Sequence, residues 1–288
     1  MIRHFMWALR RELWENRWLW LAPSAIAAAL MIGFVAYAFR LPGTVAAAAA
    51  LDAIHFHQAI IEPYEIVAGI MMAVGIFVAV VYCVDALYGE RRDRSVLLWK
   101  SLPVSDLETV LAKLCIPVLV LPLICWGLTI ALHILMLLTS SAVLTAHGGN
   151  AAVLWSGTQL LPDEFGLLYH LVVLHGIAAA PIYAWMLLVS AWAPRAPLAW
   201  ALLPPAAIGV IERVAFGTTR FAEMLIAPLG GGGAGSSATT PAGGGMMAEL
   251  MRPSLGQLLV SLAFWVGLAI AALFVLGAVR LRRASQPV

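Results

Sequence analysis

Residues 114–138 read LCIPVLVLPLICWGLTIALHILMLL, a block of 25 residues that contains no Asp, Glu, Lys or Arg. The hydrocarbon core of a bilayer is about 30 Å thick and an α-helix rises about 1.5 Å per residue, so about 20 apolar residues cross it. The block is therefore long enough and apolar enough to form a transmembrane helix.

The rest of the chain has the same character. Of its 288 residues, 62% are hydrophobic and 11% are charged, whereas soluble domains are about 25% charged. The apolar residues gather into uncharged blocks, so the sequence predicts an all-α integral membrane protein with six transmembrane helices. The six blocks run over residues 18–39, 66–84, 114–138, 167–192, 196–211 and 255–279.

The fifth block, 196–211, is the shortest and contains Pro204 and Pro205, which remove backbone donors and bend a helix. It could form a short span, or one arm of a hairpin with the fourth block. If it did not cross, the arginine cluster at 280–283 would lie outside, which the positive-inside rule disfavours. We therefore expect six spans.

The placement of positive charge predicts the orientation. With the N-terminus inside and six spans, 13 of the 17 Lys and Arg residues fall in inner segments. The loop at 139–166, which would then lie outside, has no Lys or Arg. Because cytoplasmic loops are enriched in these residues, we expect a multi-pass protein of the cell inner or plasma membrane with both termini in the cytoplasm.

The N-terminal segment 1–17 has the pattern of an amphipathic helix, with a large apolar face and arginines at every seventh position. Four tryptophans crowd the same stretch, and tryptophan prefers the headgroup level of a membrane. We therefore expect an interfacial helix along the inner leaflet, either as a plain anchor or as a relay of motion. Its apolar residues are Ile2, Phe5, Met6, Leu9 and Leu13, and its arginines are Arg3, Arg10 and Arg17.

The inner loop 85–113 carries two distinct patterns. Its first half holds a dense charge cluster at 90–94, followed by Leu97 and Trp99. In its second half Ser105 stands three residues before Glu108, the spacing of a capping box that starts a helix. From these residues alone the loop is either a solvated connector whose charges set the topology or a short helix that docks on a partner.

Glu90, the apolar turn at 97–102, the Pro103-Val104-Ser105 turn and Lys113 together resemble the first cytoplasmic loop of permease subunits of ABC exporters of the second type. The Arg-Glu-Leu-Trp-Glu-Asn-Arg helix at 11–17, the six spans and the long outer segment between the last two fit the same family. The departure is a flexible Gly-rich outer segment at 230–245, where members of the family more often place compact re-entrant helices.

The resemblance implies a permease that moves a substrate across the inner membrane and pairs with a second copy or a homologue. A separate cytoplasmic ABC ATPase subunit would receive the short helix of the loop 85–113 in a cleft. ATP and Mg²⁺ would be bound by that partner, and this chain would hold no cofactor and catalyse no reaction. The residues that the resemblance assigns to ATPase docking are Glu90, Arg91, Arg92, Leu97, Trp99 and Lys100.

Absences in the sequence agree with this division of labour. There is no Gly-x-x-x-x-Gly-Lys-Ser/Thr phosphate loop. The formal charge of +2 gives no basic field for nucleic acid, although membrane lipid remains an expected partner. His55 and His57 with Glu62 and Glu65 lack the spacing of a metal site, so we expect no bound metal.

Three histidines, His133, His170 and His175, fall within or near the third and fourth blocks. An ionisable group at membrane depth is either a functional residue or a neutral imidazole in an interhelical hydrogen bond. Two alternatives to the permease stay open, namely an ion-coupled secondary transporter and an intramembrane enzyme. Both need carboxylates or paired catalytic groups at membrane depth, and by the predicted boundaries only Asp85 comes close.

Overall fold

The computed structural model describes residues 2–49, 53–93, 105–157, 160–230 and 254–284. Within these ranges the chain is helical and contains no strand, so the prediction of an all-α protein is confirmed. Five of the described helices are long and apolar enough to span a membrane, and a bent pair makes a sixth.

The second to fifth spans are longer than the uncharged blocks suggested, because their helices continue beyond these blocks into turns that carry charged residues. The first span matches its block, and the sixth begins seven residues later than predicted because a separate short helix precedes it. The first is α2 (Trp18–Ala38), which follows α1 (Ile2–Glu15). The second is α4 (Ala53–Asp85), and the third joins α7 (Asp106–Cys115), the π-helical η1 (Ile116–Val120) and α8 (Leu121–Ala146). The fourth span joins α10 (Leu160–Tyr169), the π-helical η2 (His170–Ala178) and α11 (Ala180–Trp192). The fifth span is α12 (Pro197–Phe216), and the sixth is α16 (Leu262–Ala284).

Among the described residues, five short helices lie between the spans. They are α3 (Leu41–Ala49), α5 (Tyr88–Arg92), α9 (Ala152–Gly157), α13 (Arg220–Gly230) and α15 (Leu255–Val260). The predicted Gly-rich segment 230–245 lies outside the described residues beyond Gly230.

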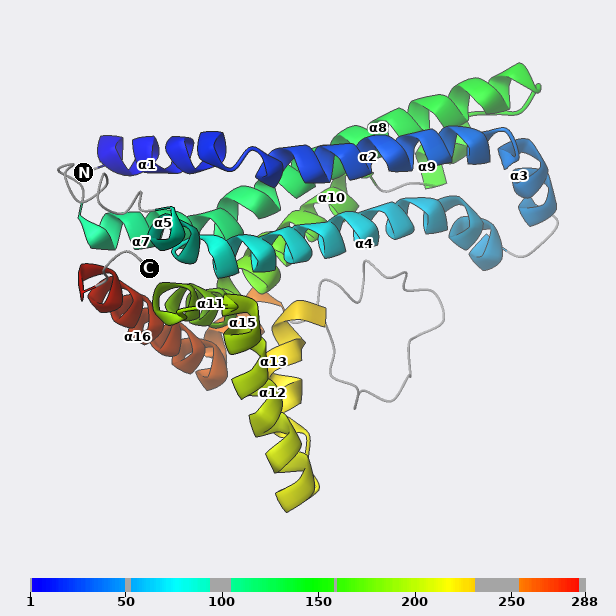
Figure 1. Cartoon of the computed structure of the whole chain (residues 1–288). Helices are drawn as coiled ribbons and strands as arrows, with labels where there is room; N and C mark the ends of the chain where they lie inside the picture. The colour runs from blue at the N-terminus through cyan, green and yellow to red at the C-terminus, as the bar shows by residue number, and fades with distance from the viewer. Residues whose placement is uncertain (1, 50–52, 94–104, 158–159, 231–253, 285–288) are drawn as a thin grey trace.

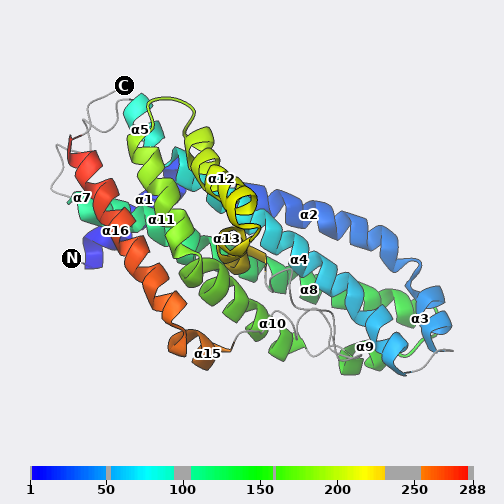
Figure 2. The ribbon, with the colours of Figure 1, turned by 90° about the horizontal axis from the view of Figure 1, so that it is seen from below.

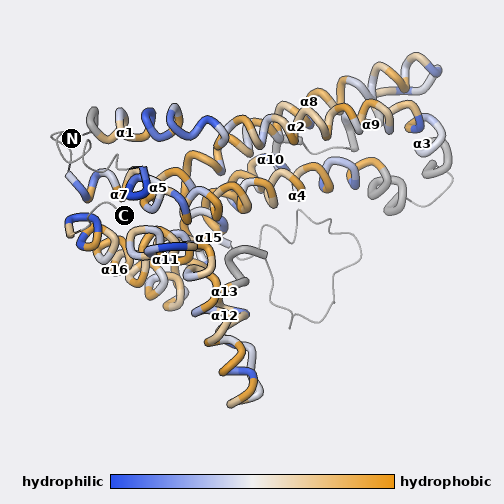
Figure 3. Tube along the Cα trace, in the orientation of Figure 1, coloured by the Kyte–Doolittle hydropathy of each residue, from blue (hydrophilic) through white to orange (hydrophobic). Residues whose placement is uncertain are grey.

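The helices α2, α4 and α8 lie side by side along one direction, and α11 and α16 pack together against them (Figures 1 and 2). Helix α1 and the end of α16 lie at the same end of this bundle, which we call the base. Hydrophilic residues gather at the base, whereas the bodies of the spans are apolar (Figure 3). The first and the last described residues therefore lie at the same end of the bundle, which is the arrangement that six crossings would give.

The core of the described residues has two large parts along the bundle and a small third one. Near the base, Tyr82 and Tyr183 are the largest fully buried side chains, and they lie in a cluster built mainly from α4, α11 and α16. Farther from the base, Phe34, Tyr64 and Met136 join α2, α4 and α8. The third cluster joins α4 to the fourth span through Leu171 of η2.

The two π-helical segments touch each other, and each interrupts its span. Pro117 lies in η1, and η2 leads into a bend of 48° between α10 and α11. At the crossing, a Cβ added to Gly176 would lie 2.1 Å from the carbonyl oxygen of Val118, so the two backbones meet where only glycine fits. Wide π turns of this kind often mark functional positions in helices.

Helix α12 projects from the side of the bundle and packs little against it (Figure 1). Ala201 is its one buried residue, and its carbonyl oxygen accepts a hydrogen bond of 3.0 Å from the indole of Trp185. The helix continues through Pro204 and Pro205 without a break and is long and apolar enough to span a membrane. That it crosses, rather than forming a hairpin with the fourth block, stays a prediction. Its apolar face is one that lipid or another protein would cover.

Substituting Gly176→Ala should reduce the stability of the bundle, because the new methyl group would collide with the backbone oxygen of Val118. Overpacking of this kind costs at least about 1–3 kcal/mol. Gly127→Ala, on the open side of α8 with no atom within 4 Å, is the matched control and should cause no loss. Thermal unfolding in detergent compares the two, and equal midpoints would contradict the close approach.

Candidate functional site

Charged side chains from four separate segments meet at the base of the bundle. Glu12 comes from α1, Glu90 from α5, Asp106 and Lys113 from α7, and Arg282 from α16. We call these five residues the basal ion cluster. They join the beginning of the chain, both sides of the loop after the second span, and the end of the last span.

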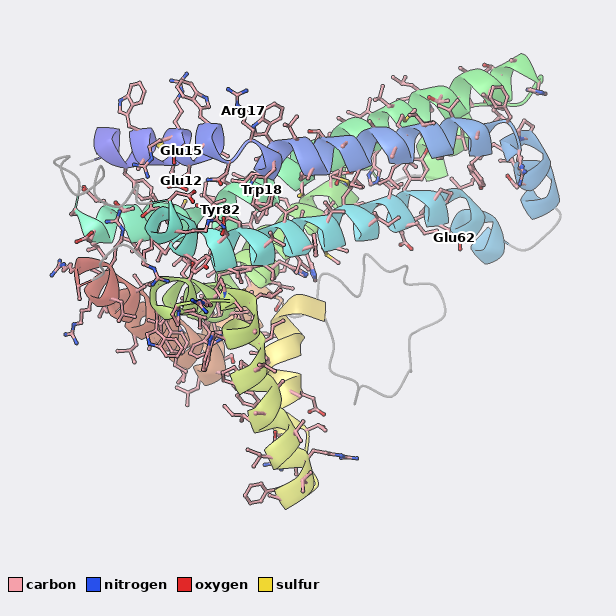
Figure 4. The ribbon with its side chains drawn as sticks, in the orientation of Figure 1. Glu12, Glu15, Arg17, Trp18, Glu62 and Tyr82 are labelled. Atoms are coloured by element: carbon pink, nitrogen blue, oxygen red, sulfur yellow. The ribbon has the colours of Figure 1, made fainter. Side chains whose placement is uncertain are left out.

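Lys113 lies at the centre of the cluster. Its ammonium Nζ is 2.9 Å from Oε1 of Glu12 and 3.1 Å from Oε1 of Glu90. The hydroxyl of Tyr82 donates a hydrogen bond of 2.8 Å to the second oxygen of Glu12, and the two residues face each other between α1 and α4 (Figure 4). The side chains of Lys113 and Glu12 are only 3% and 1% exposed, so this ion pair is buried.

Arg282 extends the cluster to the flanks of segment 94–104. Its Nη2 is 3.2 Å from Oε2 of Glu90, and its Nη1 hydrogen-bonds Oδ1 of Asp106. Arg283 adds a looser contact, with Nε 3.7 Å from the other oxygen of Asp106. One guanidinium thus holds the residues on either side of the segment together.

The free-energy cost of burying a charge explains why these charged side chains lie together. Moving an ion out of water costs several kcal/mol, and the cost is offset only when counter-charges and hydrogen bonds surround it. Arg11 adds a third positive charge, 3.1 Å from Glu12, so that three basic groups face three acidic ones. The cluster therefore determines which helices pack together, and this effect is larger than its contribution to net stability.

The pKa of Glu12 shows which effect dominates. Burial works to raise the pKa of this carboxyl, but the ammonium of Lys113, the hydroxyl of Tyr82 and the guanidinium of Arg11 together outweigh burial. The pKa of Glu12 is therefore lower than its ordinary value, and the group is ionised at neutral pH. Glu15, which lies near the edge of the cluster, has its pKa raised, chiefly by burial.

A second polar junction ties the start of α5 to the end of α11. Arg91 donates to the carbonyl oxygens of Ser190 at 2.9 Å and Ala193 at 2.7 Å. The hydroxyl of Ser190 accepts hydrogen bonds from the backbone N–H groups of Leu87 and Tyr88. A cation at a helix C-terminus is favourable because the last carbonyls lack partners and carry partial negative charge.

The predicted docking residues divide into three groups. Glu90 and Arg91 point into the protein and have partners within the chain. Arg92 is exposed and pairs with Asp93 at 3.1 Å. The other three, Leu97, Trp99 and Lys100, lie outside the described residues. Docking of an ATPase on this loop stays a prediction. Glu90 and Arg91 would then hold the loop against the bundle rather than contact the ATPase.

The N-terminal helix is confirmed, and its two faces differ. The face toward the bundle carries Glu12, whereas Trp7, Arg10 and Trp14 lie on the exposed face. The guanidinium of Arg10 is 4.9 Å from the ring centroid of Trp14 and 5.7 Å from that of Trp7, a cation–π arrangement. Seen from below, α1 turns away from the line of α2 (Figure 2). Its position at a membrane surface stays a prediction.

The three histidines predicted within or near the spans, His133, His170 and His175, are buried. His133 hydrogen-bonds a carboxylate oxygen of Glu164 on α10, and its other ring nitrogen is 3.1 Å from the carbonyl oxygen of Tyr64 on α4. This confirms an interhelical hydrogen bond for His133. The rings of His170 and His175 lie with centroids 4.6 Å apart and are tilted by 46° to each other, and His175 lines a small apolar cavity.

The fourth span was predicted to begin at 167, but its helix α10 starts at Leu160, so Glu164 lies within the helix, in the first turn of the candidate span that begins at Pro162. That only Asp85 comes near membrane depth stays a prediction. Among the described residues no group of three His, Cys, Asp or Glu side chains is arranged to hold a metal ion.

Sequence reasoning also missed Glu12 and Lys113 as partners, since charges near a span were interpreted as topology signals. One signal could have found Glu12. It lies three residues after Leu9 and next to Leu13, on the apolar face of α1, where an unpaired carboxylate would be costly.

The chain matches no protein-family model, no curated protein and no solved structure. No family is therefore identified for it. The structure by itself shows a multi-pass helical membrane protein whose base is joined by the basal ion cluster.

Replacing Lys113→Met should destabilise the protein by about 3–5 kcal/mol, since it leaves Glu12 and Glu90 buried and facing each other without the ammonium. Adding Glu12→Gln to this variant should recover part of the loss. Arg92→Met is the control at an exposed ion pair and should change little. Thermal unfolding in detergent measures all three, and an equal loss in the control would argue against the cluster.

Acid should release α1 only at low pH. Because the pKa of Glu12 is lowered in the folded protein, its stabilising effect is complete above the unfolded value of about 4.3 and disappears as the pH falls through the folded value. We expect hydrogen exchange of residues 2–15 to stay slow, after correction for intrinsic rates, from pH 7 to pH 5 and to rise below about pH 4. Glu12→Gln should remove that acid transition, and release of α1 already at pH 6 would contradict the assignment.

Proposed function

We propose that this chain is the permease subunit of an ATP-binding cassette exporter. It would move a substrate across the inner membrane, with ATP and Mg²⁺ bound and hydrolysed by a separate cytoplasmic subunit. The observation that carries the proposal is that Arg282 holds Glu90 and Asp106, the two flanks of segment 94–104.

A segment clamped in this way is suited to receive force. Through Glu90 and Lys113, a displacement of the segment would act on α1, and through Arg282 it would act on α16. The contacts are buried ion pairs, which resist separation because a lone buried charge is costly. A partner that pushes on this segment would therefore move several helices together.

The second junction gives the same movement a path to the bent span. Arg91 and Ser190 fasten α5 to the end of α11, and α11 continues through η2 into α10. Discontinuous helices are common where membrane transporters change shape. Movement at the base can thus reach the break between α10 and α11.

The ion-coupled secondary transporter remains the second candidate, and the pair His133–Glu164 is the observation that favours it. An ionisable pair of this kind at membrane depth is typical of proton relays. The two candidates differ in whether the chain works alone. On the permease proposal it also needs a second copy or a homologue, and it contributes no catalytic residue of its own.

Purification of the tagged full chain from its native host in mild detergent tests the proposal. We expect an ATPase subunit with a phosphate loop to co-purify in stoichiometric amount, as identified by mass spectrometry. Trp99→Ala should abolish this co-purification by removing the apolar contact of the loop. Trp155→Ala, an exposed tryptophan beside α8 at the far end of the bundle, should leave it intact. A folded chain that always purifies alone would favour the secondary transporter.

A further inference from the structure

The half of the bundle away from the base contains a buried acid–base pair that the proposed function does not use. His133 on α8 hydrogen-bonds Glu164 on α10 through Nδ1, and both side chains are 6% exposed. Trp126 on α8 donates from its indole to the backbone oxygen of Glu164 at 2.9 Å, which fixes α10 in place. The pair therefore lies at a defined contact between two spans.

The second ring nitrogen of His133 decides where the protons are. Nε2 is 3.1 Å from the backbone carbonyl oxygen of Tyr64, and a carbonyl only accepts hydrogen bonds, so Nε2 carries a hydrogen. A further proton must then lie between Nδ1 and the carboxylate of Glu164, because without it a lone pair would face an anion. The pair is either imidazolium with carboxylate or imidazole with carboxylic acid, and both forms hold the same number of protons.

Among the described residues, His133 is the basic group that the structure places in contact with this carboxylate. In the part of the chain that the structure describes, the ion pair of Glu164 is with His133, and its Oε2 is buried without a hydrogen-bond partner. The titratable group that faces the imidazole from α4 is Tyr64, whose ring lies edge-on at 5.4 Å between centroids. Loss of the shared proton would leave an uncompensated negative charge in a buried site, which is strongly unfavourable.

We infer that His133 and Glu164 form a proton-binding site that closes the contact between α8 and α10, and that separation of these helices releases one proton. On separation the hydrogen bond between Nδ1 and Oε1 breaks and the proton passes to water. A neutral imidazole and a solvated carboxylate remain. The inference rests on the geometry of the pair and holds whether or not an ATPase drives transport.

The sign of the pH dependence follows from proton counting. In water, histidine titrates near pH 6.5 and glutamic acid near pH 4.3. Above about pH 6.5 the separated pair holds fewer protons than the closed pair, by one at most, so each further pH unit favours separation by up to about tenfold. Between about pH 5 and 6 the two states hold equal numbers of protons, and separation is independent of pH.

Hydrogen exchange of α10 in the full chain, reconstituted in lipid nanodiscs, measures this separation. We expect the exchange of residues 160–169, corrected for intrinsic rates, to rise by up to about tenfold per pH unit between about pH 7 and 8.5 and to be flat from pH 5 to 6. In Glu164→Gln the amide can donate to Nδ1 of a neutral imidazole, and separation then releases no proton, so exchange should be independent of pH between about pH 7 and 8.5. Asp163→Asn makes the same acid-to-amide change one residue away and should behave like the wild type.

Two outcomes would overturn the inference. The first is exchange of residues 160–169 that does not change between pH 7 and 8.5 in the wild type. This result needs no variant, so the test stays valid even if a substitution disturbs folding. The second is an equal pH dependence of exchange in the wild type and in Glu164→Gln over the same range. Exchange of residues 262–284 in α16, far from the pair, reports on the general state of the bundle in each sample.

Discussion

The packing of the base depends on the buried ammonium of Lys113, which lies between the carboxylates of Glu12 and Glu90. A charge in a low-dielectric interior must be surrounded by opposite charge and hydrogen bonds. Helices α1, α5 and α7 can therefore pack only in an arrangement that brings both carboxylates to the lysine. Arg282 applies the same requirement to α16. The position of the last span therefore depends on Glu90, in the loop that follows the second span.

The two halves of the bundle use buried polar groups in different ways. At the base, permanent charges of both signs cancel, and the contacts are stable over a wide pH range because the pKa of Glu12 is lowered. In the far half, His133 and Glu164 share one proton, so their contact depends on that proton. Between the two halves lies the crossing of η1 and η2, where the fourth span bends. A fixed base and a proton-dependent contact beyond a bend are compatible with a protein that opens at one end.

Helix α12 illustrates a limit of apolar packing in membranes. In water its exposed residues, among them Val214 and Phe216, would be forced against the bundle. Lipid tails are as apolar as these side chains, so no hydrophobic force drives the helix inward. Association in a membrane depends instead on close packing and hydrogen bonds, and α12 has one such bond, to Trp185.

The sequence by itself determined that the chain is helical, where its apolar blocks lie, and that Ser105 and Glu108 cap the helix that begins the third span. These are local properties, because the length and hydropathy of a segment or the spacing of a cap do not depend on distant residues. Only the tertiary structure decided that Glu12 meets Lys113, 101 residues away, that Arg282 reaches Glu90, and that Glu164 lies beside His133. Such pairs depend on which helices become neighbours, and no local pattern encodes a contact between segments so far apart.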